Sequence, residues 1–185
     1  MSKVTRPILT GVFPRKRLFR QLDRFRKQPI IWVSGPPGCG KTTLINSYIE
    51  ARKLPCLWYQ IDEGDSDIAT FFYYLGQAAK RASPRKRILL PLLTPEYLQG
   101  IPTFTQRYFE NLYNRLKIPF ILVFDNYHEI PAESSFHEII FNGLSNIPQG
   151  KNIILISRSE PPSILIRLRA NNLMSILGWD ELRLT

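Results

Sequence analysis

Five short runs of apolar residues recur along the chain, separated by longer segments in which apolar residues follow a helical spacing. The runs read IIWVS, CLWYQI, FILVF, NIILIS and LMSILGW, at residues 30–34, 56–61, 120–124, 152–157 and 173–179. Short β-rich runs that alternate with amphipathic segments are typical of a parallel sheet with helical connections. The sequence therefore predicts an α/β fold with a five-stranded parallel sheet flanked by helices.

Helical spacing is clearest in four connecting segments, residues 42–51, 67–81, 103–116 and 133–147. A fifth helix is expected after Pro161 and Pro162, because proline is well placed in the first turn of a helix. The proline-bearing stretch 83–102 has no clear period and predicts a loop with a short helix. Aromatic residues at helical spacing are interpreted as core packing.

The stretch GPPGCGKT, residues 35–42, fits the phosphate-loop (Walker A) consensus G-x-x-x-x-G-K-[ST] between a predicted strand and a predicted helix. Gly35 and Gly40 permit backbone conformations that let successive amides point at a phosphate. The following helix adds its N-terminal amides. Lys41 is expected to bridge the β- and γ-phosphates, and Thr42 to offer its hydroxyl to magnesium. The expected nucleotide-binding residues are Gly35, Pro36, Pro37, Gly38, Cys39, Gly40, Lys41, Thr42 and Thr43.

A carboxylate follows the apolar run FILVF, in the stretch ILVFDNYHEI. Asp125 at the end of such a strand can hold magnesium through a bound water, as the Walker B aspartate does. Asn126 occupies the next position, where an acidic residue commonly orients or deprotonates the attacking water. An amide can orient water but cannot act as its base. Slow turnover is expected if no other residue supplies the base.

The second run ends in the acidic cluster DEGDSD, residues 62–67. Carboxyl ends of parallel strands line the ligand crevice of such folds. We therefore hypothesise that Glu63, or less favourably Asp62, positions the water, with Asn126 in support. The competing interpretation, that the cluster only caps the helix that starts near Asp67, is equally open.

Ser157 and Arg158 follow the fourth run, where a polar or basic side chain can reach a γ-phosphate. Arg158 is interpreted as a sensor of that phosphate, with a surface salt bridge as the alternative. His128, three residues beyond Asp125, is interpreted as a loop histidine whose hydrogen bonds are satisfied.

Composition narrows the class of protein. With 44% apolar and 22% charged residues in 185, the chain predicts one globular domain without a membrane span. Two cysteines provide neither a disulfide framework nor a zinc site, which suits the cytoplasm. The net charge of +10 is uneven: residues 1–30 hold nine basic residues and one acidic residue, so they carry +8. A solvated basic segment beside an acidic neighbour is favoured over contact with a phosphate backbone.

Several motifs together resemble one family. RPILTGVFPRKRLFRQLDR, VSGPPGCGKTTL, WYQIDEGDSD, ILVFDNYHEI, LISRSEPP and LGWDELRLT occur in an order and spacing that is similar to the ATPase domain of MalT/LuxR-type transcriptional regulators. These regulators are signal-transduction ATPases with numerous domains, the STAND class. The phosphate loop is shared by many ATPases, whereas DNYHEI, SRSEPP and ELRLT are more specific. The likeness covers nearly the whole chain.

The resemblance implies a P-loop NTPase of the ASCE (AAA+-like) type, in which an extra strand separates the phosphate-loop strand from the Asp125 strand. It also implies ATP or ADP and Mg²⁺ as ligands, and a switch that rests with ADP and signals with ATP, often by self-association. Residues 1–28 would form a basic segment near the nucleotide, with Pro7 and residues 14–17 near the adenine. Residues 29–185 would form the ATPase core.

Two departures from the family pattern matter. Asn126 stands where the family usually has a second acidic residue, which argues against fast hydrolysis. The chain stops at Thr185, where such proteins continue into a winged-helix segment, a sensor array and often a helix-turn-helix reader. We therefore expect this chain to be a domain excised from a longer regulator.

These observations predict an ATP-binding, slowly hydrolysing switch domain of a cytoplasmic transcriptional regulator. Its signal would be an unidentified inducer or signalling protein, and DNA would be contacted only through a module outside this chain. Two alternatives stay open. One is a nucleic-acid-dependent ATPase, suggested by the phosphate loop and the positive charge. The other is a small-molecule phosphotransferase, which would need the arginines of PRKR, residues 84–87, over the phosphates.

Overall fold

Five parallel strands form a single sheet in the computed structural model, which describes residues 3–85, 87 and 89–183. The sheet order is β2-β3-β4-β1-β5. Every strand lies within two residues of its predicted position, because each is an uninterrupted or nearly uninterrupted apolar run. The strands are β1 (Ile30–Ser34), β2 (Cys56–Gln60), β3 (Phe120–Asp125), β4 (Lys151–Ser157) and β5 (Met174–Leu177).

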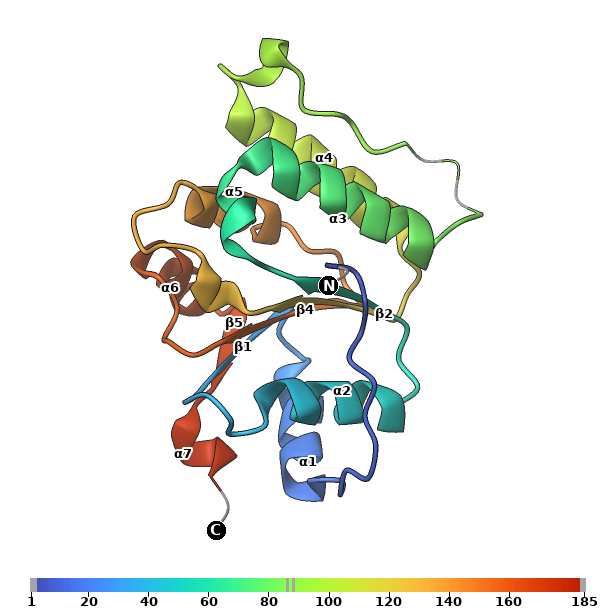
Figure 1. The fold of residues 1–185 in the computed structure, drawn as a ribbon, viewed down its shortest axis with the longest axis vertical. Coiled ribbons are helices and arrows are strands. Elements are labelled where there is room, and N and C mark those ends of the chain that lie inside the picture. Colours follow the sequence, from blue (N-terminus) through green and yellow to red (C-terminus); the bar gives the residue numbers. More distant parts are fainter. Residues whose placement is uncertain (1–2, 86, 88, 184–185) are drawn as a thin grey trace.

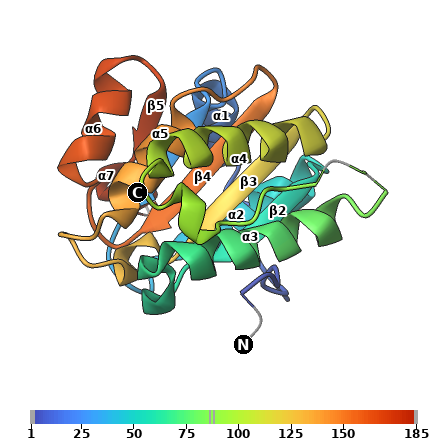
Figure 2. The ribbon, with the colours of Figure 1, turned by 90° about the horizontal axis from the view of Figure 1, so that it is seen from above.

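Helices cover both faces of the sheet (Figure 1). One face carries α1 (Lys16–Phe25) and α2 (Lys41–Ala51), and the other carries α3 (Ile68–Ala82), α4 (Ile101–Arg115) and α5 (Phe136–Leu144). Viewed from above, α3 and α4 run side by side across the sheet (Figure 2). The remaining helices are α6 (Ser163–Ala170) and α7 (Trp179–Leu182), with short 3-10 turns η1 (Glu63–Ser66), η2 (Pro95–Tyr97) and η3 (Tyr127–Glu129).

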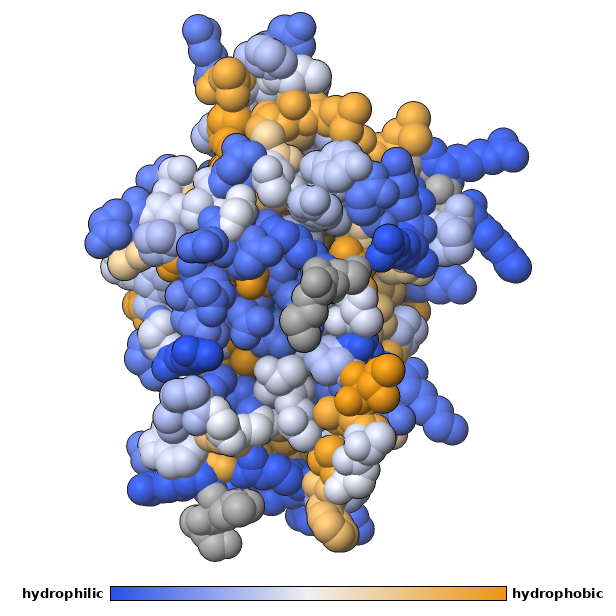
Figure 3. Space-filling model, in the orientation of Figure 1, coloured by the Kyte–Doolittle hydropathy of each residue, from blue (hydrophilic) through white to orange (hydrophobic). Residues whose placement is uncertain are grey.

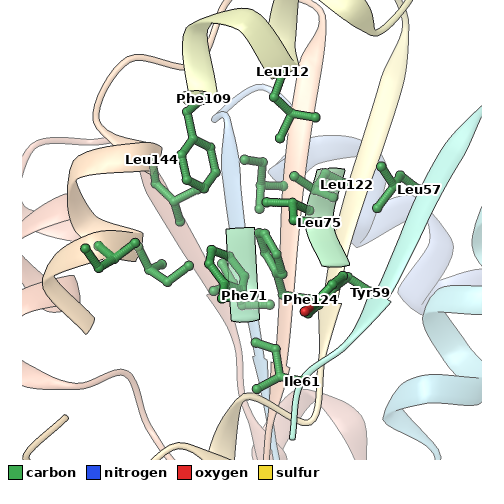
Figure 4. Packing of buried hydrophobic residues seen from close by; sticks show 14 of the residues in the cluster. Leu57, Tyr59, Ile61, Phe71, Leu75, Phe109, Leu112, Leu122, Phe124 and Leu144 are labelled. Carbon is green, nitrogen blue, oxygen red and sulfur yellow. The ribbon is translucent and has the colours of Figure 1, made fainter. Parts of the chain in front are cut away.

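Alternation along the strands produces two hydrophobic cores. On β1, Ile30 and Trp32 face the α3–α5 side, whereas Ile31 and Val33 face α1 and α2. The larger core is rich in aromatic rings, and Figure 4 shows Phe71 of α3 packed with Phe124 of β3 and Tyr59 of β2. Both faces are therefore covered, as expected for a parallel sheet.

The sequence did not predict helix α1. Its sequence KRLFRQLDRF is dominated by charge, and only Leu18, Phe19 and Leu22 are buried. These three side chains pack on α2, where the rings of Phe19 and Tyr48 lie 5.6 Å apart. The helix was overlooked among basic residues, although Leu22 lies four and three residues after Leu18 and Phe19, which is the spacing of an amphipathic helix.

Basic side chains of the N-terminal segment are largely used inside the fold. Lys3 Nζ lies 2.8 Å from Asp62 Oδ1 and 2.9 Å from Asp65 Oδ1. The guanidinium of Arg6 donates to Asn46 on α2. Arg15 and Arg17 donate to main-chain carbonyls at the end of α7. The acidic neighbour expected for this segment is confirmed at Lys3, and the other contacts are to neutral groups.

Residues 89–100 run back over α3 and α4, with η2 as their short helix (Figure 2). Leu90 and Leu93 pack against the core, whereas Leu89, Leu92 and Leu98 are exposed. Hydrophobic side chains gather over this part of the surface in Figure 3. The predicted loop with a short helix is confirmed.

Candidate functional site

The carboxyl ends of β1, β3 and β4 surround a cavity of about 290 Å³. Crevices outside the carboxyl ends of parallel strands are where ligands bind in open α/β sheets. The structure brings together most of the site residues that the sequence predicts. The lining residues are Pro37, Gly38, Gly40, Lys41, Thr42, Thr43, Asp125, Asn126, His128, Ile156 and Arg158.

The phosphate loop joins β1 to α2. Gly38 and Gly40 have φ values of +78° and +83°, a region that favours glycine. Gly35 is required for a different reason than the sequence indicated, because its φ is not positive but a Cβ there would lie 3.1 Å from Cys39 Sγ and 3.2 Å from Leu182 Cδ1. Helix α2 begins at Lys41, so its N-terminal amides face the cavity.

Lys41 lies across the loop that precedes it. Its ammonium donates to the carbonyl oxygens of Gly35 and Pro36 at 2.6 and 2.8 Å. The residue is only 8% exposed. The cation is therefore held at the rim of the loop, where an anion bound by the α2 amides would meet it.

Thr42 and Asp125 place two oxygen ligands next to each other. The Thr42 hydroxyl lies 3.2 Å from Asp125 Oδ2, and Asn126 N donates to Asp125 Oδ1 at 2.9 Å. Burial raises the pKa of Asp125, while the Asn126 amide and the Thr42 hydroxyl oppose this rise. A hydroxyl and a carboxylate suit Mg²⁺, which is usually bound by one or two protein carboxylates together with phosphates and waters.

Asn126 has an unusual backbone conformation. Its φ and ψ are 62° and 36°, in the left-handed region, directly before η3. Asparagine and aspartate enter this region more readily than other non-glycine residues. The residue lines the cavity beside Asp125.

His128 also lines the cavity, contrary to its interpretation as a satisfied loop residue. Neither ring nitrogen has a hydrogen-bond partner among the described residues, although Nε2 lies 3.3 Å from Glu129 Oε1. Burial lowers the pKa of His128, and the charges of Arg158 and Lys41 lower it further, against the opposing effect of Glu129.

Arg158 is exposed and reaches the cavity from the end of β4. Ser157 does not line it. Its hydroxyl is buried and accepts a hydrogen bond from Ser159 N at 3.2 Å. Of the two residues proposed to reach a γ-phosphate, the structure therefore brings only Arg158 to the site.

The acidic cluster after β2 serves structural roles. Asp62 accepts from Gly64 N at 2.9 Å and caps η1, and Asp67 accepts from Thr70 N at 3.1 Å and caps α3. Glu63 is exposed and is not among the residues lining the cavity. The predicted cap of the helix that starts near Asp67 is confirmed for Asp67 alone, since Asp62 caps η1. The water-positioning role of Glu63 stays a prediction.

The arginine-rich stretch 84–87 does not reach the cavity. Arg85 and Arg87 are exposed and are absent from its lining, and Lys86 lies outside the described residues.

Fold and site together define a class of protein. Strand β4 separates the phosphate-loop strand β1 from the Asp125 strand β3, which is the ASCE arrangement of a P-loop NTPase. The family model described as "Nephrocystin 3, N-terminal" matches residues 12–158, and the chain belongs to this family.

Known proteins agree with this assignment. The chain is 30% identical over 187 residues to the HTH-type transcriptional regulator MalT of Serratia proteamaculans, covering 100% of this chain and 20% of that protein. The resemblance to MalT-type regulators is thereby confirmed, and the chain spans about a fifth of this relative's length.

Two solved structures share the fold. A Walker-type ATPase of Pyrococcus abyssi has a TM-score of 0.54 at 16% identity, covering 96% of this chain and 57% of its own. The ORC1 protein of Aeropyrum pernix, solved in complex with DNA, has a TM-score of 0.54 at 15% identity, covering 92% and 46%. At these identities the likeness concerns the fold alone. Within the described ranges, no helix has the length and apolar character needed to cross a bilayer.

Proposed function

We propose that this chain is an ATP- and ADP-binding, magnesium-dependent switch domain of a cytoplasmic transcriptional regulator, with slow hydrolysis of ATP. The observation that carries the proposal is the convergence of Lys41, Thr42, Asp125 and Arg158 on one cavity at the carboxyl end of the sheet. The regulatory role is extended from the relative that is named as a transcriptional regulator. Because the chain spans only part of that relative, this role belongs to the proposal.

The phosphate loop and the first turn of α2 would bind the nucleotide through their main-chain amides. Lys41 would exchange its two carbonyl partners for the β- and γ-phosphates. This exchange is favourable because charge-assisted bonds to phosphate are stronger than bonds to neutral carbonyls. Residues 35–43 thus form the proposed nucleotide site.

Thr42 and Asp125 would hold the magnesium ion, which supplies positive charge to the phosphates. Asn126 would orient a water through its amide, and Glu63 is the proposed carboxylate that positions this water. Arg158 would contact the γ-phosphate from the end of β4. Slow turnover is expected because Asn126 cannot accept a proton, and because Glu63 is exposed and does not line the cavity.

The switch would work because Lys41 and Arg158 both contact the γ-phosphate of the bound ATP. Loss of the γ-phosphate would remove the partner of Arg158 and release the segment after β4, which shifts the populations of two conformations. The proposed partners are an inducer or signalling protein and a second copy of the chain in the ATP form. DNA would be contacted through a module outside this chain.

The first test is to identify the nucleotide released when the purified protein is denatured, and then to measure ADP and ATP binding by calorimetry. We expect released ADP, and we expect Lys41→Ala to weaken ATP binding by at least about tenfold, because an interaction with a charged group is lost. Lys117→Ala, which changes an exposed lysine just before the amino end of β3, is the matched control. The proposal would be contradicted if no nucleotide is released and if the wild type and Lys41→Ala bind ATP with equal affinity.

A nucleic-acid-dependent ATPase is the second candidate. Lys16, Arg20, Arg24 and Lys27 are exposed and recur at helical spacing along α1 and just beyond it. Such a stripe could meet a phosphate backbone. Stimulation of hydrolysis by duplex DNA, lost on raising the salt concentration, would favour this candidate over the switch.

A further inference from the structure

Trp58 lies beside the carboxylate of Asp125 on the sheet. In the register of β2 and β3, Trp58 pairs with Val123 and Gln60 pairs with Asp125. Alternate residues of a strand share a face, so Trp58, Val123 and Asp125 all project toward α2. Trp58 and Asp125 are therefore diagonal neighbours on this face, a separation that aromatic side chains span.

The indole of Trp58 has an unsatisfied donor. Trp58 is 3% exposed, and its Nε1 is buried without a hydrogen-bond partner among the described residues. Trp32, the other deeply buried tryptophan, behaves differently, because its Nε1 donates to the carbonyl of Ser159 at 3.0 Å. A buried donor without an acceptor is rare in folded proteins, so an acceptor is expected within reach of this nitrogen.

The acceptor that this donor acts on is the carboxylate of Asp125. The Trp58 indole is one of the groups that oppose the rise in the pKa of that carboxyl. Asp125 already accepts from Asn126 N on Oδ1, and the Thr42 hydroxyl lies 3.2 Å from Oδ2. A third donor from β2 would fix the plane of the carboxylate while leaving its cavity side open.

We propose that Trp58 is a positioning residue for the magnesium site: its indole N–H donates to Asp125 and orients the carboxylate toward the metal. This inference rests on the proposed function, since it assigns a role to the same site. Trp58 acts through Asp125 and contacts neither metal nor nucleotide. Residues that orient metal ligands in this way typically change metal affinity by about 10–100-fold when they are removed.

The first experiment uses the nucleotide-free protein. The three tryptophans give three indole signals in a ¹⁵N–¹H correlation spectrum, which Trp58→Phe and Trp32→Phe assign. We expect Asp125→Asn to shift the Trp58 indole signal and to leave that of Trp32 in place. Because this variant keeps Trp58 intact, it remains informative if Trp58→Phe folds poorly. An unmoved Trp58 signal would overturn the contact.

The second experiment measures ADP affinity by calorimetry with Mg²⁺ and with EDTA. Trp58→Phe keeps the ring but removes the donor, and we expect the gain in ADP affinity caused by Mg²⁺ to fall on the order of tenfold. Affinity in EDTA should not change. Trp32→Phe is the matched control and should keep the full magnesium effect, whatever its loss of stability.

The outcomes separate the two proposals. An unchanged magnesium effect in Trp58→Phe would overturn the positioning role while leaving the proposed function intact. No nucleotide binding by the wild type would overturn both. The indole spectrum decides the Trp58–Asp125 contact without reference to either, because it needs no ligand.

Discussion

Asn126 meets a backbone requirement and a chemical one at the same position. Its left-handed φ of 62° limits the side chains that fit without strain. Aspartate enters this region about as readily as asparagine does, so the backbone does not account for the amide. The backbone conformation would accept a carboxylate here, so the choice of an amide affects the chemistry of the site and not its folding.

This distinction makes Asn126→Asp a clean test of hydrolysis. If Glu63 positions the water, Glu63→Gln should lower steady-state ATP turnover roughly 100-fold or more, since general bases contribute about 10²–10⁴. Asn126→Asp should raise turnover or leave it unchanged without loss of stability. Glu96→Gln, which changes an exposed glutamate in η2, is the control. Equal turnover in Glu63→Gln and wild type would remove Glu63 from the mechanism.

The sequence identified those site residues that belong to a spaced motif. Lys41, Thr42, Asp125 and Arg158 could be predicted because a phosphate loop and strand ends determine where they lie. The position of His128 in the cavity, with two buried ring nitrogens that lack partners among the described residues, could not be predicted, since burial and tertiary contacts decide it. Trp58 was not identified for the same reason, because its importance depends on a cross-strand neighbour.

At the scale of elements, helices α4 and α5 approach unusually closely. Gly143 on α5 faces the ring of Phe109 on α4, and a Cβ at Gly143 would lie 2.5 Å from that ring. The hydroxyl of Tyr113 on α4 donates to the Gly143 carbonyl at 2.6 Å. The close packing of α4 against α5 therefore requires a glycine at position 143.

We therefore expect Gly143→Ala to lower the free energy of unfolding by about 1–3 kcal/mol, the usual cost of overpacking a core. Urea unfolding measures it. Gly100→Ala is the control, because a Cβ there meets no atom closer than 4.0 Å. Adding Phe109→Leu to Gly143→Ala should recover part of the loss. A fully stable Gly143→Ala would show that α4 and α5 separate at little cost.

Elements differ in how well the sequence predicts them. The strands were located because a short, continuous apolar run is typical of a strand that is covered on both faces of a parallel sheet. Helices α3 and α4 were located by their period, and α4 begins two residues earlier than expected because Pro102 fits within its first turn. Helix α1 was missed although Leu18, Phe19, Leu22 and Phe25 follow a helical spacing, because the segment was interpreted by its basic charge.

For the whole molecule, stability should depend on pH through its histidines. His137 is buried on α5, with Nδ1 2.8 Å from the Tyr127 hydroxyl and Nε2 2.9 Å from the Pro131 carbonyl. A neutral ring protonated on Nε2 satisfies both contacts. Burial lowers the pKa of His137, and the contact with the Pro131 carbonyl opposes this effect.

A group whose pKa is lowered by folding binds more protons in the unfolded state below its ordinary value of 6.5. Its contribution is therefore complete above pH 6.5 and is lost as the pH falls through the folded-state pKa. We expect urea unfolding to show lower stability at pH 5.5 than at pH 7.5. His137→Gln, which can keep both contacts without titrating, should flatten this dependence. An unchanged slope in that variant would exclude His137 as the source.

The first residues of the described chain have a consequence for solubility. Strand β2 is an outer strand of the sheet, and Gln60 N on its free side donates to the carbonyl of Lys3 at 2.8 Å. Unpaired strand edges are templates for association with other chains. The segment that begins at Lys3 therefore covers part of this edge, and its removal would promote aggregation without touching the residues that line the cavity.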